Sequence, residues 1–483
     1  MKKIFRVCSL GLILVYMFAL CACNSKNSSN NGNNQTTSTS EQTSSVVTTE
    51  TTEETTTETT IPETTVEVPK AIYGNGPEQI NLWSYNSELI DCVRRYLQIH
   101  PEFGEKYSIV CSIYSQSYQA MLNQTLPKGG PDAPDIYAVE AGSVAEYTKG
   151  KMAKYAATYK QLGIDVDEKI KAAEIQQYTV DVGTRDGEVI ALSYKNNAGL
   201  MIYRFSIAKK VFGTGDPSKI EEIFGAGTGK LDKLLDAAAK LKKNGYALVS
   251  SPDEVWNLCD GAATTPWVVN GEIDVAPERA AYLDIGKQLV SNGYTNNTAA
   301  WTQEWFNDMN GKSKTKVFAY FQPEWFLSYT LAPNAAKTSG DWRVCAPPAG
   351  FFTGGEWILA REGTTQKEGV AQLIEWITLD TSKTGYQYLL ANDKTAKAPV
   401  VSNVVMRMSV YKQSVCKGQD LYPVIVKSSQ YVSAKNIQKS SFILSTVFVD
   451  NAKRYFSGGI DDKDKAISSF KSMARDRYGM FDE

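Results

Sequence analysis

Aromatic and carboxylate side chains stand at several positions where they could take part in binding. Tyr85 and Glu140 each end an apolar run that is typical of a β-strand, and Glu356 and Trp357 follow a Gly-Gly pair that would let backbone approach a ligand closely. Rings stack on flat apolar surfaces and carboxylates accept hydrogen bonds from hydroxyl groups, a combination that suits a carbohydrate. The alternative for each ring is core packing, because Trp is mostly buried. Weaker candidates of the same kind are Trp83 and Trp301.

Other kinds of chemistry find little support in the composition. The chain has one histidine, His100, which largely excludes His-based catalysis and multi-His metal sites. A net charge of −2 provides no basic surface for nucleic acid. The glycine-rich residues 225–230 look superficially like a phosphate-binding loop, but Leu231 stands where Ser or Thr should be, so we interpret them as a flexible loop. We expect no metal, no organic cofactor and no catalytic residue.

The cysteines beyond the N-terminal region are scattered, with no CxxC pair and no metal-ligand spacing. We interpret them as small buried hydrophobic residues, and a disulfide between two of them stays an open alternative. These residues are Cys92, Cys111, Cys259, Cys345 and Cys416, of which Cys92 and Cys111 are the candidate pair.

Strand and helix patterns alternate from about Gly76 onward. Apolar strand patterns lie at residues 80–85, 107–113 and 133–139, and amphipathic helix patterns lie between them at 89–97 and 118–126. The strand at 133–139 is apolar on both faces, which predicts a central position in a parallel sheet. This β-α-β-α-β order implies a doubly wound α/β lobe whose ligands bind outside the carboxyl ends of its strands.

Residues 180–212 form the next distinctive stretch. Val180 and Val182 alternate with polar residues, which predicts a strand, and Asp186-Gly187 predicts a hairpin turn leading into an apolar strand at 189–192. A polar break at 194–197 precedes another apolar strand at 199–203 and a short helix that ends near Lys209 and Lys210. Two interpretations stay open: an ordinary hairpin within one α/β domain, or a crossing from one lobe to another.

The N-terminal residues have the pattern of a secreted, lipid-anchored protein. Basic residues at 2, 3 and 6 precede an apolar run at 7–20, too short for a membrane span, and Leu20-Cys21-Ala22-Cys23 resembles the bacterial lipobox. We therefore expect a signal peptide at 1–22, acylation of Cys23 and attachment to the outer face of the cytoplasmic membrane. Residues 23–75, rich in Asn and Ser and then in Thr and Glu, predict a disordered tether.

Several segments together resemble a known family. "INLWSYNSE", "LQIHPEF", "SYQAML" and "APDIYAVE", followed by the crossing at 181–212, are similar to the extracellular solute-binding proteins of ABC transporters, family 1, the sugar-binding, maltose-binding-protein-like group. The resemblance covers most of residues 78–475 and implies a type II periplasmic-binding-protein-like fold, with two doubly wound lobes joined by multiple crossovers. It divides the chain into lobe 1 (76–194 and 347–391) and lobe 2 (195–346 and 392–483).

The resemblance also implies a binding residue. Residues 317–325 match the family's strand-to-helix element whose first aromatic lies against bound sugar, which assigns that role to Trp325. Residues 342–348 and 396–400 match later crossings between the lobes, and 352–359 match a strand in lobe 1. Residues 229–234 match the family pattern only loosely, so the region 213–230 departs from it.

The expected function follows from these assignments. A lipid-anchored, monomeric receptor would capture a carbohydrate, which the family resemblance implies to be an oligosaccharide, and deliver it to the transmembrane subunits of an ABC permease. One alternative is a surface-anchored glycosidase that uses Glu324 and Glu356 as paired carboxylates. Another is a binding protein for peptides, phosphate or iron, although phosphate and iron would call for motifs that the chain lacks.

Overall fold

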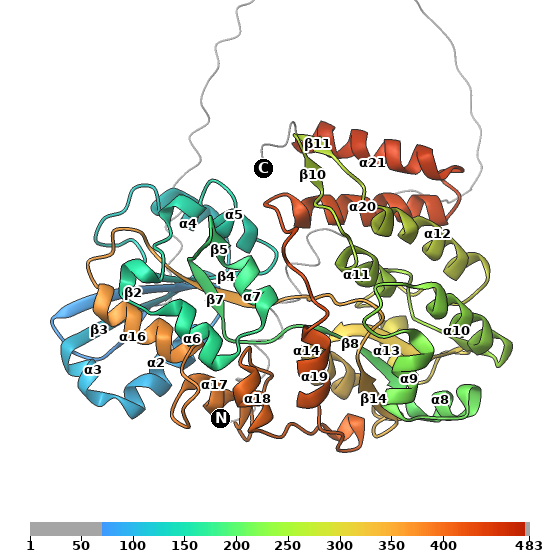
Figure 1. Cartoon of the computed structure of the whole chain (residues 1–483), viewed down its shortest axis with the longest axis horizontal. Coiled ribbons are helices and arrows are strands. Elements are labelled where there is room, and N and C mark those ends of the chain that lie inside the picture. Colours follow the sequence, from blue (N-terminus) through green and yellow to red (C-terminus); the bar gives the residue numbers. More distant parts are fainter. Residues whose placement is uncertain (1–69, 479–483) are drawn as a thin grey trace, which may run out of the picture. The chain divides into compact units, whose positions relative to one another are not determined.

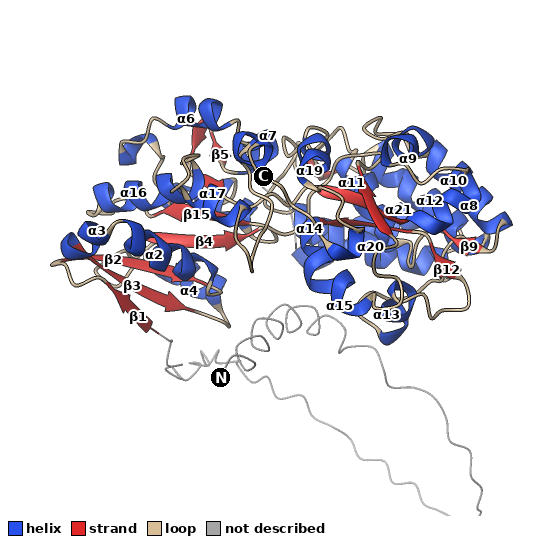
Figure 2. Cartoon of the chain, turned by 90° about the horizontal axis from the view of Figure 1, so that it is seen from below, coloured by secondary structure: helices blue, strands red, loops and turns tan. Residues whose placement is uncertain are grey.

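A six-stranded mixed sheet organises the first part of the chain in the computed structural model, which describes residues 70–478 (Figure 1). Its strand order is β1-β3-β2-β4-β15-β7; β2, β3 and β4 run parallel, and the other pairings are antiparallel. Figure 2 shows β1, β3, β2, β4 and β15 side by side. Their bounds are β1 (Lys70–Tyr73), β2 (Glu78–Ser84), β3 (Tyr107–Ile113), β4 (Ile136–Glu140), β7 (Ala191–Ser193) and β15 (Glu356–Ala360). We call this sheet and its helices the first lobe.

Successive residues of the central strands enter different cores, because side chains alternate between the two faces of a sheet. In β15, Ile358 joins one buried cluster with Ile80 of β2, whereas Trp357 and Leu359 join another with Trp83. Both faces are therefore covered, as the doubly wound prediction requires. The helices and helical turns of this lobe are α2 (Glu88–Ile99), α3 (Pro101–Lys106), α4 (Tyr118–Thr125), α5 (Val144–Thr148), η1 (Ala153–Tyr155), η2 (Lys160–Leu162), α6 (Val166–Ala173), α7 (Gln177–Val182), α16 (Lys367–Thr378), α17 (Tyr386–Ala391) and α18 (Asn403–Arg407).

A second sheet is built around β8 (Gly199–Arg204), which lies between β13 (Ala319–Pro323) and β14 (Trp342–Cys345) and is antiparallel to both. A parallel pair, β9 (Tyr246–Ala247) and β12 (Lys316–Val317), and a small hairpin, β10 (Val268–Val269) with β11 (Glu272–Ile273), belong to the same part. Strand and helix segments alternate here too, but sequence periodicity does not reveal the antiparallel direction of β8. We call these strands and their helices the second lobe.

Helices enclose the strands of the second lobe and supply most of its buried apolar residues. The π-helical turn η3 continues α14 without a break, and α20 packs against α12 and α21 (Figure 1). The bounds are α8 (Phe205–Phe212), α9 (Pro217–Phe224), α10 (Asp232–Lys243), α11 (Asp253–Gly261), α12 (Pro277–Ser291), α13 (Gln303–Met309), α14 (Glu324–Phe326), η3 (Leu327–Leu331), α15 (Ala332–Asn334), η4 (Ser414–Cys416), α19 (Tyr422–Ser429), α20 (Ser441–Phe456) and α21 (Lys463–Tyr478).

Three segments carry the chain between the lobes, at residues 194–198, 346–355 and 408–421. The first touches both later parts of the chain, since Lys195 forms a bridge with Val400 and Ala198 forms one with Phe352. One buried cluster contains Ile80 of the first sheet and Val344 of the second, so a continuous apolar core runs across the junction. The predicted crossing at 181–212 is therefore confirmed over the hairpin alternative.

Most predicted elements are confirmed, and one is wrong. Asp186 and Gly187 adopt positive φ angles of 51° and 82° and close the hairpin of β5 (Thr184–Arg185) and β6 (Glu188–Val189), as the Asp-Gly signal predicts. The strand predicted from Val180 and Val182 is instead the end of helix α7, in which both residues are buried. Alternation over three residues does not distinguish a strand from the buried side of a short helix.

Two predicted boundaries shift. The folded part begins at Lys70 rather than near Gly76, because β1 pairs with β3 along residues 70–73. The last crossing comes after α18 and not at residue 392, since the Ser402 hydroxyl donates to the Ala173 carbonyl at 2.7 Å and holds this segment on the first lobe. Neither shift had a local signal in the sequence.

Some expectations concern residues outside the described range. The predicted signal peptide (1–22), the acylated Cys23 and the tether up to residue 69 lie there. Within residues 70–478, no helix combines the length and the apolar character that a membrane span requires. The five cysteines of this range are free and buried, as predicted.

Candidate functional site

The candidate site lies where the strand ends of the first sheet meet the crossing segments. Tyr85 directly follows β2, Glu140 ends β4, and Glu356 begins β15. Because β2 and β4 are parallel while β15 is antiparallel to β4, these three positions lie at the same end of their strands. Glu140 and Glu356 are direct partners in the register. We name the junction cluster as Tyr85, Glu88, Glu140, Tyr194, Lys195 and Glu356.

Glu356 is the buried centre of this cluster, with only 3% of its surface exposed. The Tyr194 hydroxyl donates to one carboxylate oxygen at 2.9 Å, and the Asn86 amide contacts the other at 3.4 Å. Burial, followed by the neighbouring Glu88, raises the pKa of Glu356 to about 7, although Lys195 and the hydrogen bonds from Tyr194 and Tyr85 act in the opposite direction. At neutral pH this carboxyl group can therefore accept or donate a hydrogen bond.

Lys195 and Glu88 form the ion pair of the cluster. The Lys195 ammonium lies 2.5 Å from the carboxylate of Glu88, the first residue of helix α2. Burial lowers the pKa of Lys195, but Glu88 outweighs it, so the pKa lies above its ordinary value and the lysine stays charged. The backbone of Lys195 forms a β-bridge with Val400. Lys195 is therefore held to the first lobe although it lies in the first crossing segment.

Glu140 offers a free acceptor at the edge of the cluster. Within residues 70–478, no side chain or backbone group donates a hydrogen bond to its carboxylate. Burial raises the pKa of Glu140 above its ordinary value. This partly buried carboxylate is therefore open to an additional donor, such as a ligand hydroxyl.

Trp325 of α14 reaches the cluster from the second lobe. Its indole N–H donates to the carbonyl of Thr353 at 2.9 Å, and the ring lies beside Gly354 in the crossing segment before Glu356. Gly354 and Gly355 have φ angles of 76° and 115°, which only glycine adopts readily, so the Gly-Gly pair is required by the backbone itself. The half-buried ring thus contacts Thr353 and Gly354, which precede the buried Glu356 by three and two residues in the chain.

Two exposed aromatic side chains of the second lobe border the same cluster. Tyr329 is 58% exposed and stands four residues after Trp325. Partial burial of its hydroxyl raises the pKa, the charge of Lys195 lowers it and that of Glu88 raises it, so both charged groups are near. Phe442, 60% exposed in the first turn of α20, lies 3.6 Å from the position that a Cβ on Gly142 would occupy, close to Glu140. Exposed rings at a polar cluster are what a sugar-binding surface needs.

Two of the predicted binding residues, Trp357 and Trp83, pack in the interior, and a third, Trp301, packs on a neighbouring ring. Trp357 is 1% exposed and its indole donates to the Thr179 carbonyl at 3.0 Å. Trp83 is buried against Tyr114, with ring centroids 4.5 Å apart. Trp301 is half-buried, with its ring centroid 5.2 Å from that of Trp305.

The structure adds five residues that sequence reasoning missed: Glu88, Tyr194, Lys195, Tyr329 and Phe442. A signal existed for three of them. Tyr194 and Lys195 open the polar break of the first crossing, and Tyr329 follows Trp325 by one helical turn. No sequence pattern places Glu88 or Phe442 at this edge.

The alternative sites from the sequence are occupied by internal contacts. The amides of Gly227 and Gly229 donate to the carbonyls of Pro347 and Pro348, both at 3.0 Å, so the glycine-rich loop is anchored rather than flexible and presents no free cradle for phosphate. Among residues 70–478, no group of three or more His, Cys, Asp or Glu side chains is placed to hold a metal ion.

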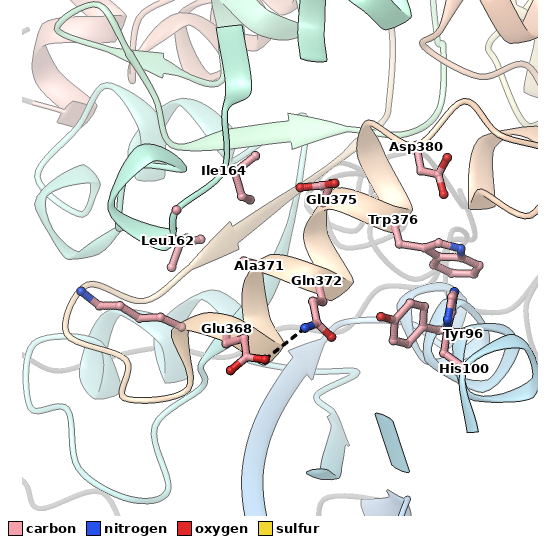
Figure 3. Close-up of a pocket in the computed structure, with 12 residues that line it drawn as sticks. Tyr96, His100, Leu162, Ile164, Glu368, Ala371, Gln372, Glu375, Trp376 and Asp380 are labelled. Carbon is pink, nitrogen blue, oxygen red and sulfur yellow. Dashed lines mark hydrogen bonds between the residues drawn. The ribbon is translucent and has the colours of Figure 1, made fainter. Parts of the chain in front are cut away.

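An open pocket of about 580 Å³ lies apart from the cluster, beside helix α16 (Figure 3). Several of its polar groups are already paired. Gln372 donates to Glu368 at 3.3 Å, and the carboxylates of Glu368 and Glu375 are ion-paired with Lys106 and Lys169. With few unpaired groups, this pocket is a weaker candidate than the junction cluster.

Comparison with known proteins gives one match to a family model, described as bacterial extracellular solute-binding protein, over residues 101–405. No functionally curated sequence is significantly similar to the chain. Solved structures with the same fold include an extracellular solute-binding protein of family 1, with 17% identity and a TM-score of 0.67 over 83% of this chain and 99% of the other.

Two further solved structures have ligand names or transport roles in their descriptions. The galacto-N-biose/lacto-N-biose I-binding protein of an ABC transporter from Bifidobacterium longum, in complex with lacto-N-biose, has 14% identity and a TM-score of 0.61 over 85% of this chain and all (100%) of the other. The sugar-binding protein MalE from Xanthomonas citri has 12% identity and a TM-score of 0.64 over 83% and 98%. The predicted type II binding-protein fold is confirmed.

Proposed function

The chain belongs to the bacterial extracellular solute-binding proteins, and from this premise we propose that it is the receptor of an ABC importer that captures an oligosaccharide and delivers it to a membrane permease. The observation that carries the proposal is the junction cluster. Buried and free carboxylates from the first lobe meet exposed aromatic rings from the second lobe beside the crossing segments. Relatives of the same fold are described in complexes with sugars such as lacto-N-biose.

The polar and apolar parts of the cluster suit a sugar. Glu140 provides an acceptor without a donor, which a sugar hydroxyl satisfies, while the buried Glu356 keeps Tyr194 and Asn86 as its own donors and supports the cluster from beneath. Tyr329 and Phe442 offer exposed ring faces for the apolar C–H faces of a pyranose. The residues that we assign to the site are Tyr85, Glu88, Glu140, Lys195, Trp325, Tyr329, Glu356 and Phe442.

Ligand capture by a hinge motion follows from the connections between the lobes. Three crossing segments join the lobes side by side, and the first one carries Tyr194 and Lys195 of the cluster. A rotation about such segments would bring the second-lobe rings against a sugar held on the first lobe and expel water from it. The permease would bind the receptor with its two lobes closed around the sugar.

The anchoring proposal rests on the lipobox pattern at Leu20-Cys21-Ala22-Cys23. Acylation at Cys23 would attach the protein to the outer face of the cytoplasmic membrane, with the Asn/Ser/Thr/Glu-rich segment after it as a tether, and we propose that the receptor acts there as a monomer.

The glycosidase alternative loses one of its two carboxylates. Glu324 is 4% exposed and accepts hydrogen bonds from Tyr411, Ser328 at 2.7 Å and Gln413 at 3.4 Å. A carboxylate held by three donors of its own surroundings is poorly placed to act as an acid or a base on a sugar. We therefore propose binding without turnover.

Thermal shift of the purified protein against monosaccharides, oligosaccharides, peptides and phosphate tests the proposal. A ligand at 100 times its dissociation constant adds about 2.7 kcal/mol to the free energy of unfolding, which raises the melting temperature by several degrees. We expect shifts with a subset of oligosaccharides only. Shifts confined to peptides or anions, or release of reducing ends from a glycan, would contradict it.

A matched pair of tryptophan variants locates the site. Trp325→Ala should lower the affinity for the active oligosaccharide by at least tenfold, because its ring is held at the cluster. Trp301→Ala is the control, since this half-buried ring packs on Trp305 and should leave the affinity of the folded protein unchanged. Equal affinity in the two variants would remove Trp325 from the site.

A further inference from the structure

We propose that the junction cluster selects its ligand by charge, binding neutral and amino sugars and rejecting sugars that carry carboxylates. This inference rests on the proposed capture of oligosaccharides and adds the class of sugar. It follows from the count and the pairing of the charged side chains in the cluster, and from the absence of a free cation to receive an acidic group.

Carboxylates outnumber cations at the site. Lys195 is the single cation of the junction cluster, and its ammonium is already bound to Glu88 at 2.5 Å. Neither Glu140 nor Glu356 forms an ion pair within residues 70–478. Glu88 and Lys195 cancel, so the remaining charge of the cluster is negative whenever Glu140 or Glu356 is ionised.

The two carboxylates that lack an ion pair stand next to each other. Glu140 and Glu356 are direct partners on antiparallel strands, which places their Cβ atoms about 4.5–5.5 Å apart. A third carboxylate brought by a ligand would meet both, in surroundings dry enough to raise the pKa of each. A sugar hydroxyl has the opposite effect, because it can donate to the carboxylate of Glu140, which has no donor within residues 70–478.

An acidic sugar would also find no partner in the cluster. Proteins that bind carboxylates supply arginine or lysine in charge-assisted, often bidentate pairs. To serve a ligand carboxylate, Lys195 would have to release Glu88 and leave that carboxylate without its cation. An ammonium group on an amino sugar instead gains the unpaired Glu140.

The test compares sugars that differ only in charge. Calorimetric titration of the purified protein at pH 8, where Glu356 is ionised, would use galactobiose with digalacturonic acid, and cellobiose with its glucosamine counterpart and with a cellobiouronic acid. We expect each uronic acid to bind at least tenfold more weakly than its neutral partner, and the amino sugar to bind at least as tightly.

The outcomes separate the two proposals. Equal or tighter binding of a uronic acid overturns charge selection and leaves sugar capture standing. Binding of no sugar in any charge form, in a protein that binds peptides or anions, overturns sugar capture and this inference with it. A neutral sugar that binds while its uronic acid does not supports both.

Substitution of the unpaired carboxylate assigns the effect to the cluster. Glu140→Gln should reduce the ratio between neutral and acidic affinities at least threefold, because it removes a charge and keeps the shape. Glu168→Gln, on the exposed surface of α6, removes the same charge and should leave the ratio unchanged. The ratio of two ligands on one sample does not depend on the fraction folded, and equal ratios in both variants overturn the assignment.

Discussion

At the residue scale, neighbouring side chains of one strand have different roles because the strand alternates faces. Glu356 begins β15 and points to the junction cluster, whereas Trp357, one residue later, packs into the interior of the other face. Trp325, in contrast, is held at the cluster by one hydrogen bond to Thr353. Trp357 and Trp325 were both candidates for binding, but their removal should lower the free energy of unfolding by different amounts.

The first prediction separates stability from binding. Trp357→Ala should lower the free energy of unfolding by about 3–5 kcal/mol, because it empties a buried site and leaves the Thr179 carbonyl without its donor. Trp325→Ala should cost less than half of that, since its ring is only half-buried. Urea unfolding of both variants measures this, and equal losses would show that Trp325 is a core residue too.

The second prediction concerns pH. The folded pKa of Glu356, about 7, lies above the unfolded value near 4.5, so the folded protein binds more protons between these values and loses stability as pH rises through them. The loss is absent below pH 4.5 and complete above pH 7, and it amounts to up to about 3 kcal/mol. Glu356→Gln should therefore lose less stability than the unsubstituted protein between pH 5 and pH 8.

Urea unfolding at several pH values checks this difference. Glu254, a buried carboxyl group of the second lobe, also has its pKa raised to about 7 by burial, so part of the decline persists in the variant. Glu168→Gln serves as the control and should follow the unsubstituted protein. If the stability of Glu356→Gln declined with pH as steeply as that of Glu168→Gln, the pKa of Glu356 would not be raised in the folded protein.

At the scale of elements, one loop of the second lobe is fixed by backbone hydrogen bonds. The loop after α9 donates its Gly227 and Gly229 amides to two proline carbonyls of the second crossing. Both glycines have positive φ angles, 71° and 69°, but only Gly227 faces a close neighbour, the Tyr431 ring. The contact joins α9 and the segment after α19 across the crossing.

The third prediction uses these two glycines as a matched pair. Gly229→Ala should cost about 1 kcal/mol, from the positive φ alone, because nothing lies within 4 Å of the new Cβ. Gly227→Ala should cost at least twice as much, because its Cβ would lie 2.4 Å from the Tyr431 ring and force the ring to move. Thermal unfolding ranks them, and equal midpoints would show that the ring moves freely.

At the scale of the whole molecule, the first sheet starts earlier than its sequence pattern. β1 is an edge strand paired to β3 over residues 70–73, with Ile72 66% exposed. Its hydrogen bonds cover one side of β3, which would otherwise be an exposed edge. The beginning of the folded part is thus set by pairing rather than by a burial pattern.

The fourth prediction tests this beginning by shortening the chain. A protein that starts at residue 70 should melt at the same temperature as one that starts at residue 24. A protein that starts at residue 76 loses β1, and we expect its free energy of unfolding to fall by about 2–4 kcal/mol, at roughly 1 kcal/mol for each lost hydrogen bond. Equal midpoints for the starts at 70 and 76 would show that β1 contributes nothing.

Local patterns in the sequence determined the elements and the family. The alternation of strands and helices from residue 78 and the Asp186-Gly187 turn are confirmed, because each depends on propensities within a few residues. Ordered motifs spread over the chain identified the fold class. The short pattern at Val180 and Val182 was misread because three residues carry too little periodicity.

Only the tertiary structure decided which residues form the site. Glu140 and Glu356 are 216 positions apart in the sequence, yet they become direct partners through the antiparallel return of β15. Glu88 and Lys195 meet through the first crossing, and Phe442 reaches Gly142 from the second lobe. Long-range pairing determines these contacts, and a single sequence contains no local signal for it. The candidate rings Trp83 and Trp357 turned out to be core for the same reason: burial depends on what the rest of the chain places over them.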